Sequence, residues 1–150
     1  MARWWPVLAL PVVHALALAQ APAPHGTTLQ GDALHRALEG LWCNTADQGR
    51  TCWAYDEFFA DGRFEACGRT EDDPRGFFGA GVVSVSGQRM CYVVTRASAN
   101  FWLAPGQRYC TDITAIDERM HRYRDIDTGA EFTLLRRPRS DKHCPPAAAP

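Results

Sequence analysis

The 150-residue sequence predicts an all-β protein: an antiparallel up-and-down meander of about eight short strands closed into a small barrel, with a short N-terminal helix and disulfides. Three observations predict it. After Gly40 the chain consists of short runs rich in β-branched and aromatic residues, each bounded by turn residues. The connections leave no room for crossover helices, and a meander of this size covers its edges best by closing on itself. All six cysteines follow a segment that is typical of an export signal.

Residues 1–19 have the features of a removable signal peptide. Arg3 supplies a positive charge, Val7 to Leu18 is almost wholly apolar, and Ala17-Leu18-Ala19 is a small-x-small cleavage site. The apolar stretch is shorter than the roughly 20 residues that a membrane-spanning helix needs. We therefore expect an exported protein, periplasmic or extracellular, with no integral membrane span. A buried N-terminal helix is the alternative, which the prolines in and after this segment disfavour.

The charge of the mature chain restricts its partners, and its length restricts the number of domains. Removal of residues 1–19 leaves 15 Lys+Arg against 17 Asp+Glu, a net charge of about −2. This balance gives no electrostatic case for nucleic acid or an anionic membrane, which favour a strongly basic face. The roughly 130 remaining residues suffice for one domain with one core.

The elements follow in order along the chain. Residues 20–31, which include Pro22, Pro24 and Gly26, predict a flexible tether. Asp32 to Glu39 predicts the helix, with Asp32 as its N-cap and Gly40 as its stop. The barrel domain is expected over residues 32–138, followed by a tail over 139–150. Its strands are expected at Leu41–Cys43, Cys52–Phe59, Arg63–Cys67, Phe77–Val85, Arg89–Arg96, Arg108–Ile116, Met120–Ile126 and Ala130–Arg136.

Alternation along the strands predicts what lies inside the barrel. Asp61-Gly62 is a two-residue hairpin signal, and a turn there places Phe59 and Phe64 on one face. The same parity turns Glu57 inward, where Arg96 or Arg136 could pair with it. This arrangement predicts a cavity lined by aromatic side chains, with one polar group. Its candidate ligand-binding residues are Glu57, Trp53, Tyr55, Tyr92, Tyr109 and Trp102. The alternative is that Glu57 lies solvated near the barrel mouth or that a bulge reverses its face. Trp102 belongs to an apolar segment, Phe101 to Gly106, which we expect to plug or cover one end.

The cysteines permit 15 pairings, and sequence alone does not choose among them. Cys91 and Cys110 face the polar side of strands that are neighbours in sequence, so a bridge between them is favoured. Cys43 and Cys52 flank a polar loop and could clip it. Cys67 and Cys144 remain, and their bridge would pin the tail.

The residues Gly40-Leu41-Trp42, followed by a β meander and a late arginine at Arg136 or Arg137, resemble the lipocalin and wider calycin pattern. The resemblance implies a barrel in which Trp42 closes the bottom and Arg136 packs across it, with Gly40 as the glycine that opens the motif. The chain is also similar to small periplasmic inhibitors of secreted metalloproteases, whose N-terminal tether enters the protease cleft. Residues 20–26 would be that arm.

Catalytic signatures are missing from the sequence. It contains no HExxH motif, no Gly-x-Ser-x-Gly turn and no cysteine spacing typical of zinc sites. We therefore predict no catalytic residues, no metal and no cofactor; an enzyme would require His121, Asp125 or Glu57 to converge in one cleft. The expected function is non-catalytic binding of a small apolar or amphipathic ligand by a monomer. The alternative is a secreted or periplasmic inhibitor or protein-interaction module with a filled barrel and a secreted protein as its partner.

Overall fold

The computed structural model describes residues 29–47, 49–69 and 75–144. The expected signal peptide over 1–19 and the proposed inhibitor arm over 20–26 lie outside the described residues, as does the end of the tail over 145–150.

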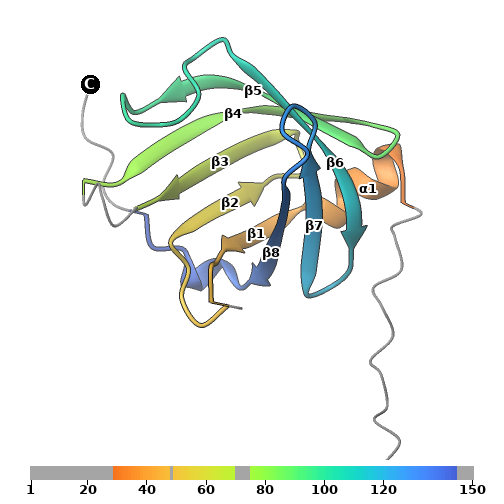
Figure 1. The fold of residues 1–150 in the computed structure, drawn as a ribbon, viewed down its shortest axis with the longest axis horizontal. Coiled ribbons are helices and arrows are strands. Elements are labelled where there is room, and N and C mark those ends of the chain that lie inside the picture. The colour runs from red at the N-terminus through yellow and green to blue at the C-terminus, as the bar shows by residue number, and fades with distance from the viewer. Residues whose placement is uncertain (1–28, 48, 70–74, 145–150) are drawn as a thin grey trace, which may run out of the picture.

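Eight antiparallel strands form a closed barrel in chain order, so the predicted fold class is confirmed (Figure 1). Each strand pairs with the next, and β1 closes the barrel against β8. The strands are β1 (Gly40–Asn44), β2 (Ala54–Phe58), β3 (Arg63–Gly68), β4 (Phe77–Ser86), β5 (Arg89–Ala97), β6 (Arg108–Ile116), β7 (Met120–Asp125) and β8 (Glu131–Arg137). Register shifts in β4 and β6 are bulges of the kind that help a small sheet to curve.

Helix α1 (Gly31–Leu38) covers one end of the barrel, which we call the closed end. Leu34 and Leu38 are fully buried and belong to the same core cluster as Trp42. The expected N-cap at Asp32 is wrong: Gln30 holds that position, without a side-chain cap, and Asp32 lies in the first turn. The Gly31 amide instead donates to the carbonyl of Gly87 at 3.0 Å, so a tertiary contact ties down the start of the helix.

Two side chains hold the other terminus of α1. The indole Nε1 of Trp42 donates to the carbonyl of Leu38 at 2.6 Å, and the Arg136 guanidinium donates to the carbonyls of Ala37 and Glu39, each at 2.6 Å. These carbonyls at the helix end have no partner within the helix. The guanidinium also lies 4.1 Å above the Trp42 ring.

Gly40 is required where α1 meets β1. It has φ of +123°, and a Cβ atom there would lie 2.6 Å from Arg136 Nη1. Gly40, Trp42 and Arg136 therefore act together to close this end of the barrel.

The turn between β2 and β3 differs from the expected two-residue hairpin. Phe59–Gly62 forms a longer turn in which Gly62, at φ of +81°, donates its amide to Phe59, and the Phe59 amide donates to Arg63, both at 3.0 Å. Phe58, rather than Phe59, therefore faces Phe64. A shift of one residue turns every β2 side chain to the other face of the sheet.

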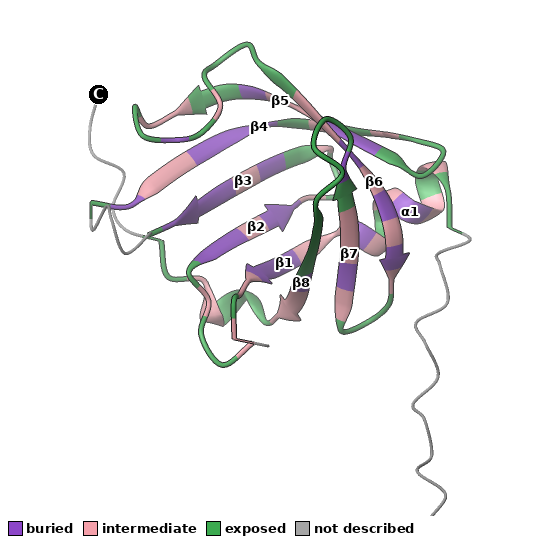
Figure 2. Cartoon of the chain, viewed as in Figure 1, coloured by how far each residue is buried: buried purple, intermediate pink, exposed green. Residues whose placement is uncertain are grey.

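The expected inward orientation of Tyr55 and Glu57 is consequently wrong. Tyr55 packs on the outer face with Leu41 and Cys67. Glu57 is 5% exposed and is buried there beneath residues 139–144, which we call the C-terminal strap. Figure 2 shows that most of β2 and β3 is buried, because residues on both faces of these strands are covered.

Two cations of the strap neutralise Glu57. Arg139 Nε and Lys142 Nζ each lie 2.8 Å from a Glu57 carboxylate oxygen, and Lys142 also reaches Glu65 at 2.8 Å. Neither of the two arginines that were expected to pair with Glu57 does so. Arg96 is exposed, with its guanidinium 5.6 Å from the centre of the Phe78 ring, and Arg136 lies at the closed end.

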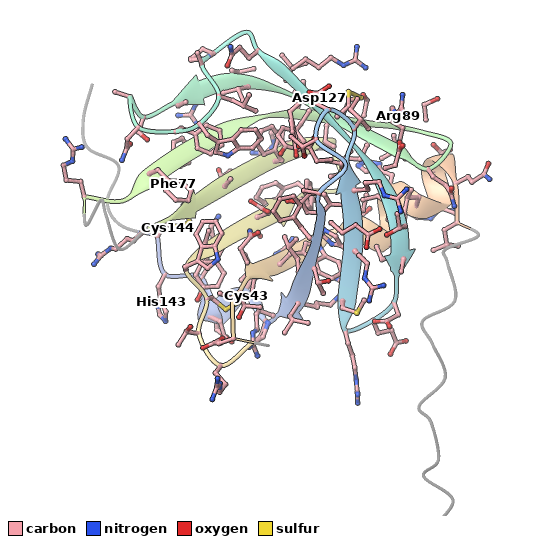
Figure 3. The ribbon with its side chains drawn as sticks, viewed as in Figure 1. Cys43, Phe77, Arg89, Asp127, His143 and Cys144 are labelled. Atoms are coloured by element: carbon pink, nitrogen blue, oxygen red, sulfur yellow. A yellow bond between two sulfur atoms is a disulfide. The ribbon has the colours of Figure 1, made fainter. Side chains whose placement is uncertain are left out.

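Three disulfides join Cys43 to Cys52, Cys67 to Cys144 and Cys91 to Cys110, and no described cysteine is free. Cys91 and Cys110 face each other directly across β5 and β6, the arrangement that their shared polar parity predicts. The bridge at Cys144 fixes the C-terminal strap to β3, and Cys43 and Cys144 can both be located in Figure 3.

Candidate functional site

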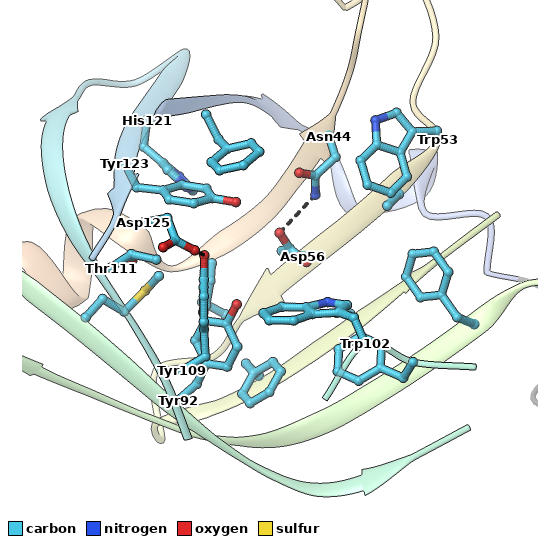
Figure 4. A pocket seen from close by; sticks show the side chains of 18 of the residues that line it. Asn44, Trp53, Asp56, Tyr92, Trp102, Tyr109, Thr111, His121, Tyr123 and Asp125 are labelled. Carbon is cyan, nitrogen blue, oxygen red and sulfur yellow. Dashed lines mark hydrogen bonds between the residues drawn. The ribbon is translucent and has the colours of Figure 1, made fainter. Parts of the chain in front are cut away.

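A cavity of about 430 Å³ enters the barrel at the end opposite α1. Half-exposed side chains line its mouth: Trp53 is 47% exposed, Trp102 is 56% exposed and Phe132 is 43% exposed. Its depth is bounded by buried core residues, among them Phe58 and Met90. The barrel is thus packed solid at the closed end and hollow at the other. Figure 4 shows side chains that line the hollow.

Aromatic rings supply most of the wall. Tyr92 lies between Phe64 and Tyr109, with ring centroids 4.8 Å and 5.2 Å away. The Trp102 indole stands edge-on to Tyr109 at 4.6 Å and to Tyr92 at 6.2 Å. The walls therefore offer several aromatic surfaces in contact with one another.

The connection between β5 and β6 places Trp102 at the mouth. Phe101, 8% exposed, is anchored over Gly79, where a Cβ atom would lie 2.4 Å from the Phe101 ring. Trp102 follows this anchor and lines the cavity. The apolar segment from Phe101 to Gly106 thus covers part of the open end through Phe101 and supplies wall through Trp102.

Asp56 is a carboxylate on the cavity wall. It projects inward from β2, and the Asn44 amide of β1 donates to its Oδ2 at 2.9 Å. Within the described part of the chain, Asn44 is its single hydrogen-bond donor, and no lysine or arginine forms an ion pair with it. Burial raises the pKa of Asp56 to about 6, and the Asn44 hydrogen bond offsets only part of this effect.

Asp125, at the end of β7, also lines the cavity but is fully engaged. The Tyr109 hydroxyl donates to one of its oxygens, and the amides of Asp127 and Thr128 donate to the other at 2.8 Å each. These bonds, with that from Tyr109 first, lower the pKa of Asp125 to about 2. Its role in the fold is to order the turn into β8.

His121 and Thr111 bound the cavity deeper in the barrel. Each is 1% exposed, and among the described residues neither His121 Nδ1 nor Thr111 Oγ1 has a hydrogen-bond partner. Burial, assisted by the positive charge of Arg136, lowers the pKa of His121 to about 3. The imidazole is therefore neutral at physiological pH, with its ring 4.4 Å from that of Trp42.

The structure brings together four of the six predicted ligand-binding residues: Trp53, Tyr92, Tyr109 and Trp102 line the cavity, whereas Tyr55 and Glu57 lie on the outer face. Glu57 is therefore separated from His121 and Asp125 by the sheet. Sequence reasoning missed Asp56, Asn44, Tyr123 and Thr111 as cavity residues, and it considered His121 and Asp125 only as residues of an enzyme. Asp56 could have been found because it shares a strand face with Ala54 and Phe58. The incorrect turn register assigned that face to the outside of the barrel.

Within the described residues, no group of three or more His, Cys, Asp or Glu side chains could hold a metal ion. A helix with the length and apolarity needed to cross a membrane is also missing from that part of the chain. Comparison with protein families, curated proteins and solved structures returns no match.

Proposed function

We propose that the protein binds a small amphipathic ligand in the barrel cavity and does so without catalysis. One observation carries the proposal: the interior that the fold leaves unfilled is walled by aromatic rings around a carboxylate that the scaffold does not neutralise. A volume of about 430 Å³ falls within the range of small-molecule sites, roughly 300–1,000 Å³.

The hollow is confined to one end, which argues that it is not a general packing defect. Protein interiors are close-packed, and the closed end obeys this rule with fully buried Trp42, Leu34 and Leu38. At the open end, large rings such as Trp102 remain half exposed around the hollow instead of collapsing into it. A ligand with an apolar body would cover these rings and remove their surface from water.

An inhibitor with a filled barrel is the weaker proposal. Its interior would be occupied by side chains, in contrast to the cavity between Tyr92, Trp102 and Tyr123.

A neutral fluorescent probe, N-phenyl-1-naphthylamine, tests binding in the cavity. We expect its emission to rise on titration with the disulfide-bonded protein. Ala66 lines the cavity and is 7% exposed, so Ala66→Leu should reduce the volume and weaken binding at least about fivefold. The same change at exposed Ala130, which does not line the cavity, is the matched control and should leave binding unchanged. Equal binding by wild type and Ala66→Leu, or no binding by either, would contradict the proposal.

A further inference from the structure

The cavity carries negative charge and no compensating positive charge. Asp56 and Asp125 line it, and no lysine or arginine among the described residues does. Elsewhere the described scaffold pairs such groups: Glu57 with Arg139 and Lys142, and Asp112 with Arg89. Asp56, by contrast, stands on the wall of a deep cavity with one neutral amide donor.

Burying a carboxylate away from water is unfavourable unless a cation or several hydrogen-bond donors compensate for the lost hydration. For Asp125 the donors are Tyr109 and two backbone amides. For Asp56 the remaining oxygen, Oδ1, takes no hydrogen bond from any described residue. The protein does not compensate Asp56 for its lost hydration. A positively charged ligand would do so.

The rings around Asp56 suit a cation as well. Tyr92 and Tyr123 lie near enough to Asp56 that its charge, after burial, contributes to raising the pKa of both hydroxyls. Trp102 stands perpendicular to Tyr92, with an interplanar angle of 85°. Aromatic faces attract ammonium groups, most strongly where water is excluded. Figure 4 shows Asp56 between the tyrosine side and the tryptophan side of the cavity.

We propose that the ligand is an organic cation with a flat apolar body, such as a protonated arylalkylamine, whose charged group rests on Asp56 among the rings of Tyr92, Tyr123 and Trp102. This inference rests on the proposed function and adds the class of ligand to it. The apolar body covers the aromatic wall, and the ammonium group donates to the free oxygen of Asp56. Anionic analogues are repelled by the two carboxylates.

Protonation of Asp56 gives this site a pH dependence. The titratable groups that line the cavity with it are Tyr92, Tyr109, Tyr123, His121 and Asp125. Burial raises the pKa of all three tyrosines, so they stay neutral, and His121 and Asp125 titrate at about 3 and about 2. Between pH 4.5 and 7.5 the charge of the cavity therefore changes at Asp56, whose pKa is about 6.

Three ligands with one indole body and different charge test the proposal by isothermal titration calorimetry at pH 7.5: cationic tryptamine, neutral tryptophol and anionic indole-3-acetate. We expect tryptamine to bind at least about tenfold more tightly than tryptophol, and indole-3-acetate to bind most weakly. Asp56→Asn keeps the shape of the side chain and should abolish the preference for tryptamine while retaining tryptophol binding, which also reports an intact cavity. Asp112→Asn removes a carboxylate on the outer face and should keep the preference. At pH 5 the wild-type preference should shrink.

The outcomes separate the two proposals. If tryptophol or the naphthylamine probe binds but tryptamine binds no more tightly than tryptophol, the cation proposal is overturned and ligand binding stands. The cation proposal is likewise overturned if Asp56→Asn keeps the full preference for tryptamine. If neither the probe nor any of the indoles binds, the proposed function fails and the cation proposal fails with it.

Discussion

At the scale of single residues, Asp56 is the group whose burial opposes folding. Its pKa in the folded protein is about 6, against 3.8 for an ordinary aspartate. The folded state therefore holds this proton more tightly than the unfolded state does. Ionisation of Asp56 therefore lowers the free energy of unfolding. This decrease is absent below about pH 4, grows as the pH rises and reaches its full size above about pH 6. A residue that destabilises the fold at physiological pH, yet faces a cavity, fits a role in binding.

We predict that Asp56→Asn stabilises the protein at pH 7.5, on the order of 1–3 kcal/mol, because an amide does not carry the buried charge. The gain should be smaller at pH 4.5 and vanish below about pH 4, as the wild-type carboxyl becomes protonated in the unfolded state as well as in the folded state. Urea denaturation of oxidised protein at pH 4.5 and 7.5 measures both values. His121, with its pKa lowered to about 3, makes the protein less stable as the pH falls below about 6.5, but this effect cancels in the difference between variant and wild type.

Asp112→Asn is a control, because it should change the stability of the protein in the opposite direction. The hydrogen bond from Arg89 lowers the pKa of Asp112, so its charged form is favoured in the folded state. Its replacement should slightly destabilise the protein at pH 7.5. An Asp56→Asn protein that is less stable than wild type at pH 7.5 would contradict the assignment of an uncompensated charge.

At the scale of elements, the C-terminal strap is more than a tail. The Cys67–Cys144 disulfide joins it to β3, and its cations neutralise Glu57 on the outer face of β2. The Glu57 side chain is 7% exposed and that of Lys142 is 20% exposed, so the ion pair is largely shielded from water. Partly buried pairs of this kind are costly to break because the remaining charge loses its partner.

Replacing Lys142 by methionine should lower the free energy of unfolding by about 1–3 kcal/mol, because Glu57 and Glu65 would lose a shared cation. Adding Glu57→Gln to Lys142→Met should recover part of the loss, which a double-mutant cycle quantifies. Arg63→Met breaks the exposed pair with Asp61 and should have little effect. Probe binding in the cavity should not change in any of these variants, since the strap lies on the other face of the sheet. A Lys142→Met protein as stable as wild type would show that the ion pairs of Lys142 with Glu57 and Glu65 do not stabilise the fold.

At the scale of the whole molecule, the disulfides close loops of different length around one barrel. Cys67 and Cys144 are 77 residues apart in sequence, whereas Cys43 and Cys52 are 9 apart. The entropy of loop closure predicts that the longer loop stabilises the fold by about 4.5 kcal/mol and the shorter by about 2.5 kcal/mol, through the unfolded state.

We therefore expect the double variant Cys67→Ala/Cys144→Ala to lose more stability than Cys43→Ala/Cys52→Ala. Thermal unfolding of both proteins under oxidising conditions compares them, with mass spectrometry confirming the two remaining bridges. An equal loss, or a larger loss for the short loop, would contradict the ranking by loop length. Release of the strap should accompany the loss of the long loop and would appear as faster proteolysis near Lys142.

Local sequence was sufficient to predict the eight strands, the barrel and the polar-face bridge at Cys91 and Cys110, because alternation and turn residues are signals that each strand carries independently. Which face of β2 lines the cavity depended instead on the packed barrel. The positive φ of Gly62 accompanies a turn longer than the hairpin signal implied, and that single shift of register moved Glu57 beneath the strap and put Asp56 into the cavity. The site consequently depends on a register that the neighbouring strands specify and that local sequence does not.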